Sequence, residues 1–303
     1  MAYIISPEKY TYEQMLEDLL ILKKQYPFIE ISQIGKSVCG KTIHAIKLGI
    51  GPKKILCNGS HHAREWMTTP LLMKFIESYC LSIVTGRPLY RYDISSIYNR
   101  CTLWIIPMVN PDGVNLVIIG LFKDSPFYSE LLQMNKENID FSSWKANIKG
   151  VDLNRNYNAG WQEYKSLEPS LGILGPSPSG FSGPYPESEP ETQGLAAFTR
   201  WLNPDMVLAF HSQGEEIFWD YKGIAPVKSE MIAKALSDVS GYKLSEPYEP
   251  GALYAGYKDW FIKEFRRPGF TIEVGRDTTP VPLSQFDEII DKNFKIILRA
   301  AVK

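Results

Sequence analysis

Three short runs in this chain are apolar at almost every position, and they constrain its fold more than any other feature. The runs cover residues 102–108, 206–210 and 269–274. A strand with one face in water alternates apolar and polar residues, whereas a strand covered on both faces is apolar throughout. The runs are therefore predicted to be central strands of a sheet with helices on both faces.

Helical patterns alternate with these runs along the sequence. A capping box at residues 11–14 precedes apolar residues at helical spacing, and Ser284 is the expected N-cap of a final helix. There is no internal repeat, so residues 1–303 are expected to form a single α/β domain around a mostly parallel or mixed sheet. The other expected elements are helices at 68–82, 190–201, 229–240 and 257–265, and strands at 29–34, 42–48 and 54–57.

Two segments are expected to lie outside these elements. Residues 110–113, Asn-Pro-Asp-Gly, have the composition of a turn. Residues 158–189 are rich in glycine, proline and serine and are too irregular for a core element. Loops of more than about 12 to 15 residues are uncommon unless they are functional or disordered. The second segment is therefore predicted to be a surface loop that flanks a site.

Composition excludes some classes of partner. The chain has 33 basic and 34 acidic residues, and its net charge of −1 gives no long-range attraction to nucleic acid or to an anionic membrane. It has no run of about 18 apolar residues and no Sec-type signal at its start, so a cytoplasmic location is expected. Four cysteines without CxxC spacing are expected to be buried free thiols in a reducing compartment.

A candidate metal site follows the strand expected at residues 54–57. His62 and Glu65 are separated by two residues, which lets an imidazole and a carboxylate bind one ion. His211 stands at the end of another expected strand, and ligand sites gather at this edge of open α/β sheets. Zinc accepts this ligand set. The open alternatives are a surface histidine beside a salt-bridged Glu65 and a buried structural His211.

A second candidate is Glu273, which lies inside the apolar run at residues 269–274. A carboxylate in such a strand costs several kcal/mol unless it is paired or lies near a metal. Beside a zinc-bound water, a carboxylate can act as general base and later deliver the proton to the leaving amine. The alternative is a structural ion pair with an arginine such as Arg276.

Taken together, five motifs resemble the zinc carboxypeptidase family in order and approximate spacing, over roughly residues 8–300. The resemblance implies a single domain with a mixed, roughly eight-stranded twisted sheet, a zinc-promoted water mechanism and recognition of a substrate carboxylate. The motifs are His62-Ala-Arg-Glu65-Trp, Asn110-Pro-Asp-Gly113, Gly150-Val-Asp-Leu-Asn154-Arg155-Asn156, His211-Ser212 and Thr271-Ile-Glu273.

The resemblance also implies roles for particular residues. His62, Glu65 and His211 match the family's ligands to one zinc ion, and Glu273 matches its general base. Asn154 and Arg155 match the pair that grips the substrate's terminal carboxylate, and a guanidinium binds a carboxylate through two parallel hydrogen bonds. Arg64 matches a position that contacts the substrate further from the scissile bond. An ordinary surface or salt-bridged Arg155 is the alternative.

The sequence departs from the family pattern at three places. Trp144 is followed by Lys145 where the family has the arginine that stabilises the oxyanion, so Lys145 is expected to take that role with a point charge. Gln213 follows the His211-Ser212 pair where pancreatic-type enzymes have an aromatic residue. The tyrosine that caps the bound carboxylate has no clear match, because Gly251 stands at its position. Tyr248, Tyr254 and Tyr257 lie nearby.

The departures resemble a bacterial subgroup of γ-D-glutamyl-diamino-acid peptidases, which cleave between γ-D-glutamate and meso-diaminopimelate in peptidoglycan stem peptides. Lys258 matches the specificity position, where a cation would favour a side-chain carboxylate; a solvated helix residue is the alternative. The implied partner is a peptide with a free carboxylate, namely a muropeptide. The subgroup signatures are Trp144-Lys-Ala-Asn147, His211-Ser-Gln-Gly-Glu-Glu216 and Gly256-Tyr-Lys-Asp-Trp260.

Three other functions compete with this interpretation. An ordinary metallocarboxypeptidase would release the last residue of α-linked peptides, and an amide hydrolase would act on N-acyl amino acids. A binding protein without activity is disfavoured, because the expected ligands and the expected base are all present. For the peptidoglycan substrate, release from the cytoplasm to the cell wall is the alternative location.

Overall fold

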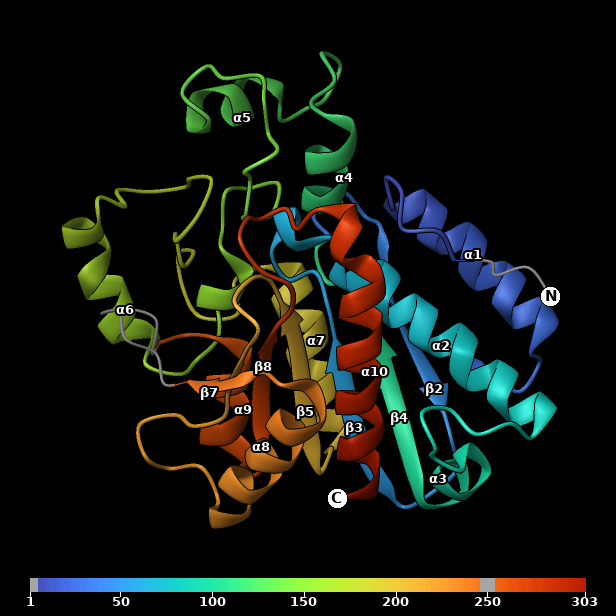
Figure 1. The fold of residues 1–303 in the computed structure, drawn as a ribbon. Helices are drawn as coiled ribbons and strands as arrows, with labels where there is room; N and C mark the ends of the chain where they lie inside the picture. Colours follow the sequence, from blue (N-terminus) through green and yellow to red (C-terminus); the bar gives the residue numbers. More distant parts are fainter. Residues whose placement is uncertain (1–4, 246–253) are drawn as a thin grey trace.

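A single mixed sheet organises the molecule (Figure 1). The structure is a computed structural model, and it describes residues 5–245 and 254–303. Within these residues the strand order is β1-β2-β4-β3-β5-β8-β6-β7, which confirms the expected eight-stranded mixed sheet. The strands are β1 (Glu30–Lys36), β2 (Thr42–Leu48), β3 (Lys53–Asn58), β4 (Cys101–Ile106), β5 (Met206–His211), β6 (Glu216–Phe218), β7 (Lys243–Ser245) and β8 (Gly269–Glu273).

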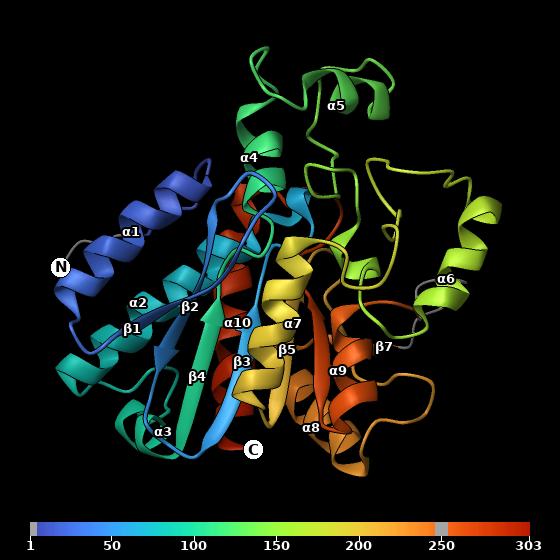
Figure 2. The ribbon, with the colours of Figure 1, turned by 180° about the vertical axis from the view of Figure 1, so that it is seen from behind.

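Helices cover both faces of this sheet, as expected. Figure 1 shows α2 and α10 in front of the strands, and Figure 2, from behind, shows α7 and α9 on the opposite face. The α-helices are α1 (Tyr12–Gln25), α2 (Thr68–Thr85), α3 (Ile94–Arg100), α4 (Pro111–Ile119), α5 (Tyr128–Met134), α6 (Trp161–Leu167), α7 (Pro190–Leu202), α8 (Val227–Ser240), α9 (Tyr257–Phe265) and α10 (Phe286–Val302).

The central strands are apolar because each face of the sheet has its own core. All six residues of β4 and all six of β5 are buried. Along β5, Leu208 and Phe210 pack in the core that contains α2, α8 and α10, whereas Val207 and Ala209 pack in the core beneath α7 and α9. Full burial of an aliphatic or aromatic side chain contributes about 1.5–3 kcal/mol.

The parallel register brings several strand ends to one edge of the sheet. Strands β4, β3, β5 and β8 run parallel in that order, and β2 and β6 flank them in antiparallel pairing. His211 and Glu273 are the last residues of β5 and β8 and are paired in register. The loop that follows β3 leaves the sheet at the same edge. Side chains far apart in the sequence therefore meet there.

Two local expectations were wrong. Residues 110–113 begin helix α4, because the Asn110 side chain accepts a hydrogen bond from the Gly113 amide and Pro111 takes the first helical position. Ser284 lies inside a short 3-10 turn (Leu283–Gln285), and α10 begins at Phe286 without a side-chain cap. The expected cap at the first helix is confirmed, since the Thr11 side chain accepts a hydrogen bond from the Gln14 amide.

The segment 158–189 is more ordered than its composition indicates. It contains α6 and a 3-10 turn (Glu168–Leu171). The buried Glu168 carboxylate accepts hydrogen bonds from the amide and hydroxyl of Ser182 at 2.7 and 2.6 Å, and it forms an ion pair with Lys165. These contacts add to a small hydrophobic cluster in which Trp161 and Tyr164 of α6 pack against Ala255. The short elements α3, α5, β6 and β7 were also not expected from the sequence.

Two further observations bear on the expected environment of the chain. None of the helices in the described parts of the chain has the length and apolar character needed to cross a membrane. All four cysteines are free thiols, as expected, and Cys57, Cys80 and Cys101 are buried. Cys39 is exposed, so the expectation that all four are buried was wrong for this residue.

Candidate active site

The loop after β3 is held rigidly in position. The amides of Ala63 and Arg64 donate to the carbonyl oxygens of Lys145 and Trp144 at 3.1 and 3.0 Å. The buried Ser60 amide donates to the hydroxyl of Thr68 at 2.8 Å, which ties the loop to the start of α2. Residues Ala63–Glu65 form a 3-10 turn. In such a turn the side chains three residues apart lie on the same side, so His62 and Glu65 face one point.

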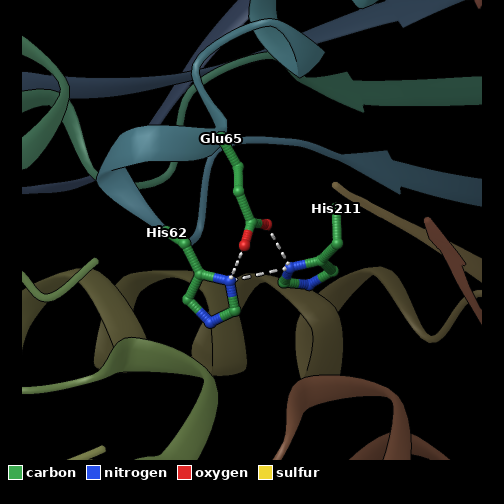
Figure 3. Close-up of side chains that lie close together, drawn as sticks. All are labelled: His62, Glu65 and His211. Carbon is green, nitrogen blue, oxygen red and sulfur yellow. Dashed lines mark hydrogen bonds and ion pairs between the residues drawn. The ribbon is translucent and has the colours of Figure 1, made fainter. Parts of the chain in front are cut away.

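His62, Glu65 and His211 converge in the structure (Figure 3). The Nδ1 atom of His62 lies 2.7 Å from one carboxylate oxygen of Glu65, and Nδ1 of His211 lies 2.9 Å from the other. The two Nδ1 atoms are 3.1 Å apart. All three residues are buried, and their ligand atoms lie within 4.8 Å of one another. They form the one such metal-ligand cluster among the described residues.

The electrostatics of this cluster fit a zinc ion. Burial lowers the pKa of His211, so its imidazole is neutral near pH 7 and presents a lone pair. Burial alone would raise the pKa of Glu65, but the charge of His62 and hydrogen bonds from both histidines hold it well below its ordinary value. Two imidazole nitrogens and one carboxylate are the donor set of many catalytic zinc sites. His62 is buried, so the alternative of a surface histidine was wrong, and His211 is not isolated, because its Nδ1 atom contacts Glu65.

Asp152 contacts His62 at the ring nitrogen that points away from Glu65 and so orients the ring. This role was not expected from the sequence. Its Oδ1 atom lies 3.2 Å from the Nε2 atom of His62. A carboxylate on the outer ring nitrogen fixes the tautomer, so Nδ1 is left free to bind a metal. The available signal was the position of Asp152 two residues before Asn154 in the third motif. A loop aspartate has many other uses, and only the folded chain places this one against His62.

Lys145 lies in the same group of residues. Its Nζ atom is 3.6 Å from Oδ2 of Asp152, and its side chain is partly exposed. Burial alone would raise the pKa of Asp152, but the charges of Lys145 and His62 hold it well below its ordinary value. The carboxylate therefore stays ionised and lies between the Lys145 ammonium and the His62 ring. The role expected for Lys145, stabilisation of the oxyanion, stays a prediction.

Glu273 lies next to His211 at the end of β8. Its side chain is half-buried, and burial together with the charge of Glu65 raises its pKa well above the ordinary value. The alternative partner, Arg276, instead bonds to Glu215 at 3.2 Å and to Glu288 at 2.8 Å. The structural ion pair considered for Glu273 was therefore wrong. A carboxylate with a raised pKa beside a metal site suits proton transfer.

Asn154 and Arg155 stand in a 3-10 turn (Leu153–Arg155) that follows Asp152. Oδ1 of Asn154 accepts the Tyr257 amide at 2.9 Å, so this side chain is fixed against the start of α9. The guanidinium of Arg155 donates to the Asn154 carbonyl at 2.9 Å and lies 5.3 Å from the Tyr164 ring centroid. It has no ion pair with the carboxylates of the described residues. Within the described parts of the chain, Arg155 therefore retains donors for a ligand and forms no salt bridge.

Arg64 and Lys258 are placed differently from each other. Arg64 follows His62 by two positions and is half-buried, and its Nε atom has no hydrogen-bond partner in the described residues. Lys258 is buried, with Nζ 2.6 Å from Oδ1 of Asp259 and bonded to the Asp220 carbonyl oxygen. The alternative of a solvated Lys258 was wrong. Its charge is balanced within the protein, so it is not the free cation that the family position indicated.

The contacts of the candidate tyrosines reduce the number that could cap the bound carboxylate. Tyr257 is fully buried, and its hydroxyl lies 2.9 Å from the hydroxyl of Thr199, so it belongs to the core. Tyr254 is half-buried and lies under the ammonium of Lys222, with 4.5 Å between Nζ and the ring centroid. Tyr248 and Gly251 fall outside the described residues.

The segment 158–189 does flank the site, as predicted. The carbonyl oxygen of Pro178 accepts the amides of Lys145 and Ala146 at 2.9 and 3.0 Å. The amide of Asp152 donates to the Phe181 carbonyl, and Oδ2 of Asp152 accepts the Gly180 amide. The segment therefore supports the backbone of two residues that surround His62.

Known proteins share this sequence and fold. The chain is 40% identical over 291 residues to "Gamma-D-glutamyl-L-diamino acid endopeptidase 1" of Lysinibacillus sphaericus, and the match covers 96% of this chain and 72% of that protein. It is 37% identical over 279 residues to "Uncharacterized protein YqgT" of Bacillus subtilis (strain 168), and this match covers 91% of this chain and 72% of that protein. The crystal structure of thrombin activatable fibrinolysis inhibitor superposes with a TM-score of 0.72 at 19% identity. This superposition covers 96% of this chain and 73% of that chain.

The family itself is shown by a match over most of the chain. Residues 13–296 match the family described as "Zinc carboxypeptidase". The buried cluster of two histidines and one glutamate supplies the ligand set that a zinc enzyme of this kind requires. The chain is therefore a zinc metallopeptidase and belongs to the zinc carboxypeptidase family.

Proposed function

We propose that this enzyme hydrolyses the bond between γ-D-glutamate and meso-diaminopimelate in peptidoglycan stem peptides. The observation that carries the proposal is the 40% identity over 96% of the chain with a γ-D-glutamyl-L-diamino acid endopeptidase. The subgroup signatures around Trp144, His211 and Gly256 support the same substrate. Residues 1–303 act as one catalytic domain in this proposal.

The proposed chemistry uses one zinc ion held by His62, Glu65 and His211. Zinc in such a site polarises the scissile carbonyl and lowers the pKa of a bound water towards about 7. Glu273 takes the proton of the attacking water and later delivers it to the leaving amine. The ammonium of Lys145 stabilises the negative charge that develops on the carbonyl oxygen.

The proposed substrate contacts lie around this centre. Arg155 and Asn154 hold the substrate's free carboxylate, because the Arg155 guanidinium has no carboxylate partner among the described residues. Arg64 contacts the substrate further from the scissile bond, where its Nε is available. Lys258 donates its third ammonium hydrogen to a side-chain carboxylate while it keeps its bonds to Asp259 and to the Asp220 carbonyl.

A comparison of two substrates tests the proposed bond. We expect release of meso-diaminopimelate from L-Ala-γ-D-Glu-meso-diaminopimelate, and loss of this activity on addition of a chelator and its return with zinc. The second substrate is an α-linked acyl dipeptide with a free C-terminal carboxylate. Cleavage of the α-linked substrate alone would show that the enzyme is an ordinary metallocarboxypeptidase, which the family name equally allows.

We also propose that the enzyme acts in the cytoplasm on recycled muropeptides. The four free thiols, one of them exposed, suit a reducing compartment. Fractionation of the producing cell provides the measurement. Recovery of the enzyme in the medium or wall fraction would contradict this location and favour action on the wall itself.

A further inference from the structure

One face of β6 and β8 remains accessible beside the metal site. Along β8, Thr271 and Glu273 are half-buried, whereas Ile272 between them is fully buried. Along β6, Glu216 and Phe218 are half-buried around the fully buried Ile217. Ile217 and Ile272 pack in the core that contains α8 and α10. We call the accessible surface formed by residues 216, 218, 271 and 273 the β6–β8 face.

This face points to the same side of the sheet as the metal ligands. Glu216 is paired in register with Glu273, and Glu273 with His211. Directly paired residues on neighbouring strands project to the same side. Two residues before His211, Ala209 packs in the core beneath α7 and α9. The β6–β8 face therefore continues the surface on which the metal site lies.

Glu216 contributes a carboxylate to this face. A Cβ atom built on Gly214 would lie 3.4 Å from Cγ of Glu216 and 3.8 Å from Cβ of Glu273, so the two glutamates stand next to each other. The partner of Glu216 is Lys243, with 3.3 Å between Nζ and Oε1. The Lys243 side chain is 75% exposed, and ion pairs this exposed contribute about 0–1 kcal/mol. A ligand ammonium can therefore replace it.

The buried ammonium of Lys258 has other partners than Glu216. The ammonium of Lys258 bonds to Asp259 and to the carbonyl of Asp220, which follows the end of β6. This contact fixes Lys258 at the border of the β6–β8 face with its charge already balanced. The accessible charge on the face is therefore negative, and it favours a cationic group on a ligand.

Asn154 and Arg155, which we call the carboxylate grip, bind the substrate's free carboxylate in the proposed function. The position of the β6–β8 face relative to this grip indicates which part of the substrate the face contacts. The Asn154 side chain accepts the amide at the start of α9, and the next residue of that helix, Lys258, reaches the end of β6. The proposed carboxylate grip and the β6–β8 face therefore lie on either side of the start of α9. A residue whose carboxylate is held by Asn154 and Arg155 can direct its side chain towards Glu216.

We propose that Glu216 binds the side-chain ammonium of the residue on the carboxyl side of the scissile bond, and so selects diamino acids over apolar residues. This inference rests on the proposed function and specifies its substrate class. Lysine and diaminopimelate both carry such an ammonium, and norleucine is the isostere of lysine that lacks it. Glu216 is then a determinant of specificity that acts by direct contact with the substrate.

The test compares L-Ala-γ-D-Glu-L-Lys with L-Ala-γ-D-Glu-L-norleucine on the zinc-loaded full chain. We expect Glu216→Gln to lower the ratio of kcat/KM for lysine over norleucine by about 10- to 100-fold, as for the loss of a charged hydrogen bond. Glu215→Gln is the matched control, because Glu215 instead bonds to Arg276 and Lys292, and it should keep the wild-type ratio. Lys243→Met should raise the ratio, since it removes the competing ammonium.

The ratio is independent of the fraction of enzyme that is folded, because both substrates meet the same preparation. An unchanged ratio in Glu216→Gln, or an equal fall in Glu215→Gln, would overturn the assignment. If the wild type cleaves neither of these two substrates nor L-Ala-γ-D-Glu-meso-diaminopimelate, the proposed function fails separately. The variants are then compared on α-linked acyl dipeptides that end in lysine or norleucine. Loss of the lysine preference in Glu216→Gln alone supports the role of Glu216, and an unchanged ratio overturns it.

Discussion

The chemistry of this enzyme depends on single carboxylates placed where burial is costly. Glu65 and Asp152 are buried, and neighbouring cationic groups keep the pKa of each well below its ordinary value. For Glu273, burial and the charge of Glu65 instead raise the pKa. In the proposed mechanism, carboxylates therefore serve as a metal ligand, an orienting group and a proton acceptor, and the local environment decides which.

We predict that Glu273→Gln keeps its zinc and loses most of its turnover. The amide cannot accept the proton of the attacking water, and general acid–base catalysis contributes about 10²- to 10⁴-fold in rate. The measurements are zinc content and kcat. Glu264→Gln, a change on the outer part of α9, provides the control with normal turnover. A variant at position 273 with wild-type kcat would remove this residue from the mechanism.

For Asp152→Asn we predict weaker zinc binding by about 10- to 100-fold, the usual effect of losing the carboxylate behind a histidine ligand. The neutral amide no longer stabilises the Nε2–H tautomer of His62, and it no longer balances Lys145. Competition with a chromophoric chelator measures the affinity. Asp205→Asn, which affects a carboxylate that accepts the Lys54 amide at the edge of the sheet, should bind zinc normally. Equal affinities in both variants would contradict the orienting role.

At the scale of elements, the beginning of α4 connects two loops of the active site. Oδ1 of Asn110 caps the helix by accepting the Gly113 amide. Its Nδ2 donates to the carbonyl oxygens of His61 and Ala146, which adjoin the metal ligand His62 and Lys145. One buried side chain therefore fixes a helix and both loops. The segment resembles a turn in sequence because its most important bonds are formed with residues distant in the chain.

We expect Asn110→Ala to lower the free energy of unfolding by about 2–4 kcal/mol. The change removes a helix cap, which contributes about 0.5–2 kcal/mol, and it leaves two buried carbonyl oxygens without a donor. Urea unfolding measures the loss. Asn99→Ala serves as the control, because the Asn99 amide bonds to one carbonyl on an exposed helix. A loss of the same small size in both variants would show that Asn110 does not connect the loops.

At the scale of the whole molecule, a buried acid attaches helix α7 to the loop between β1 and β2. Glu191 is fully buried in the first turn of α7, and its Oε1 accepts the Val38 amide at 3.0 Å. Burial raises the pKa of this carboxyl to about 7, with smaller contributions from the charges of Asp112 and Glu189. The folded protein therefore holds a proton there at pH values where the unfolded chain has released it.

This raised pKa predicts a loss of stability as pH increases. The ordinary pKa of a glutamate carboxyl is 4.5, and below this pH Glu191 is protonated in the folded and in the unfolded state. Its burial as an acid therefore does not change the free energy of unfolding there. From pH 4.5 to about 7 the ionisation of Glu191 stabilises the unfolded state increasingly, so the free energy of unfolding falls. Above about pH 7 this decrease remains constant at roughly 3 kcal/mol. Glu191→Gln keeps the acceptor for Val38 and should remove this loss.

Thermal unfolding of both proteins between pH 4.5 and 8, with a chelator present so that metal loading does not vary, checks this prediction. The difference in stability between Glu191→Gln and the wild type should grow with pH and become constant above about pH 7. A difference independent of pH would show that Glu191 is ionised throughout the range in the folded protein.

Much of the fold was readable from the sequence because its signals are local. The apolar runs that became β4 and β5 need burial on both faces, and this requirement is independent of their neighbours in the sheet. The run that became β8 is buried on one face, whereas Thr271 and Glu273 on the other face are half-buried. The short strands β6 and β7 have three residues each and no periodicity to detect. Their formation depends on pairing with β8 and with each other, which is a non-local event.

The sequence by itself determined the α/β class and the residues around which the site forms. His211 and Glu273 end apolar strands, and His62 and Glu65 follow another, because parallel strands bring their carboxyl ends to one edge. Tertiary structure alone decided that Asp152 orients His62, that Asp259 neutralises Lys258 and that Glu216 stands beside Glu273. The reason is physical: ionic contacts depend on distances of a few ångströms, which strand order and register fix and the spacing of residues in a chain does not.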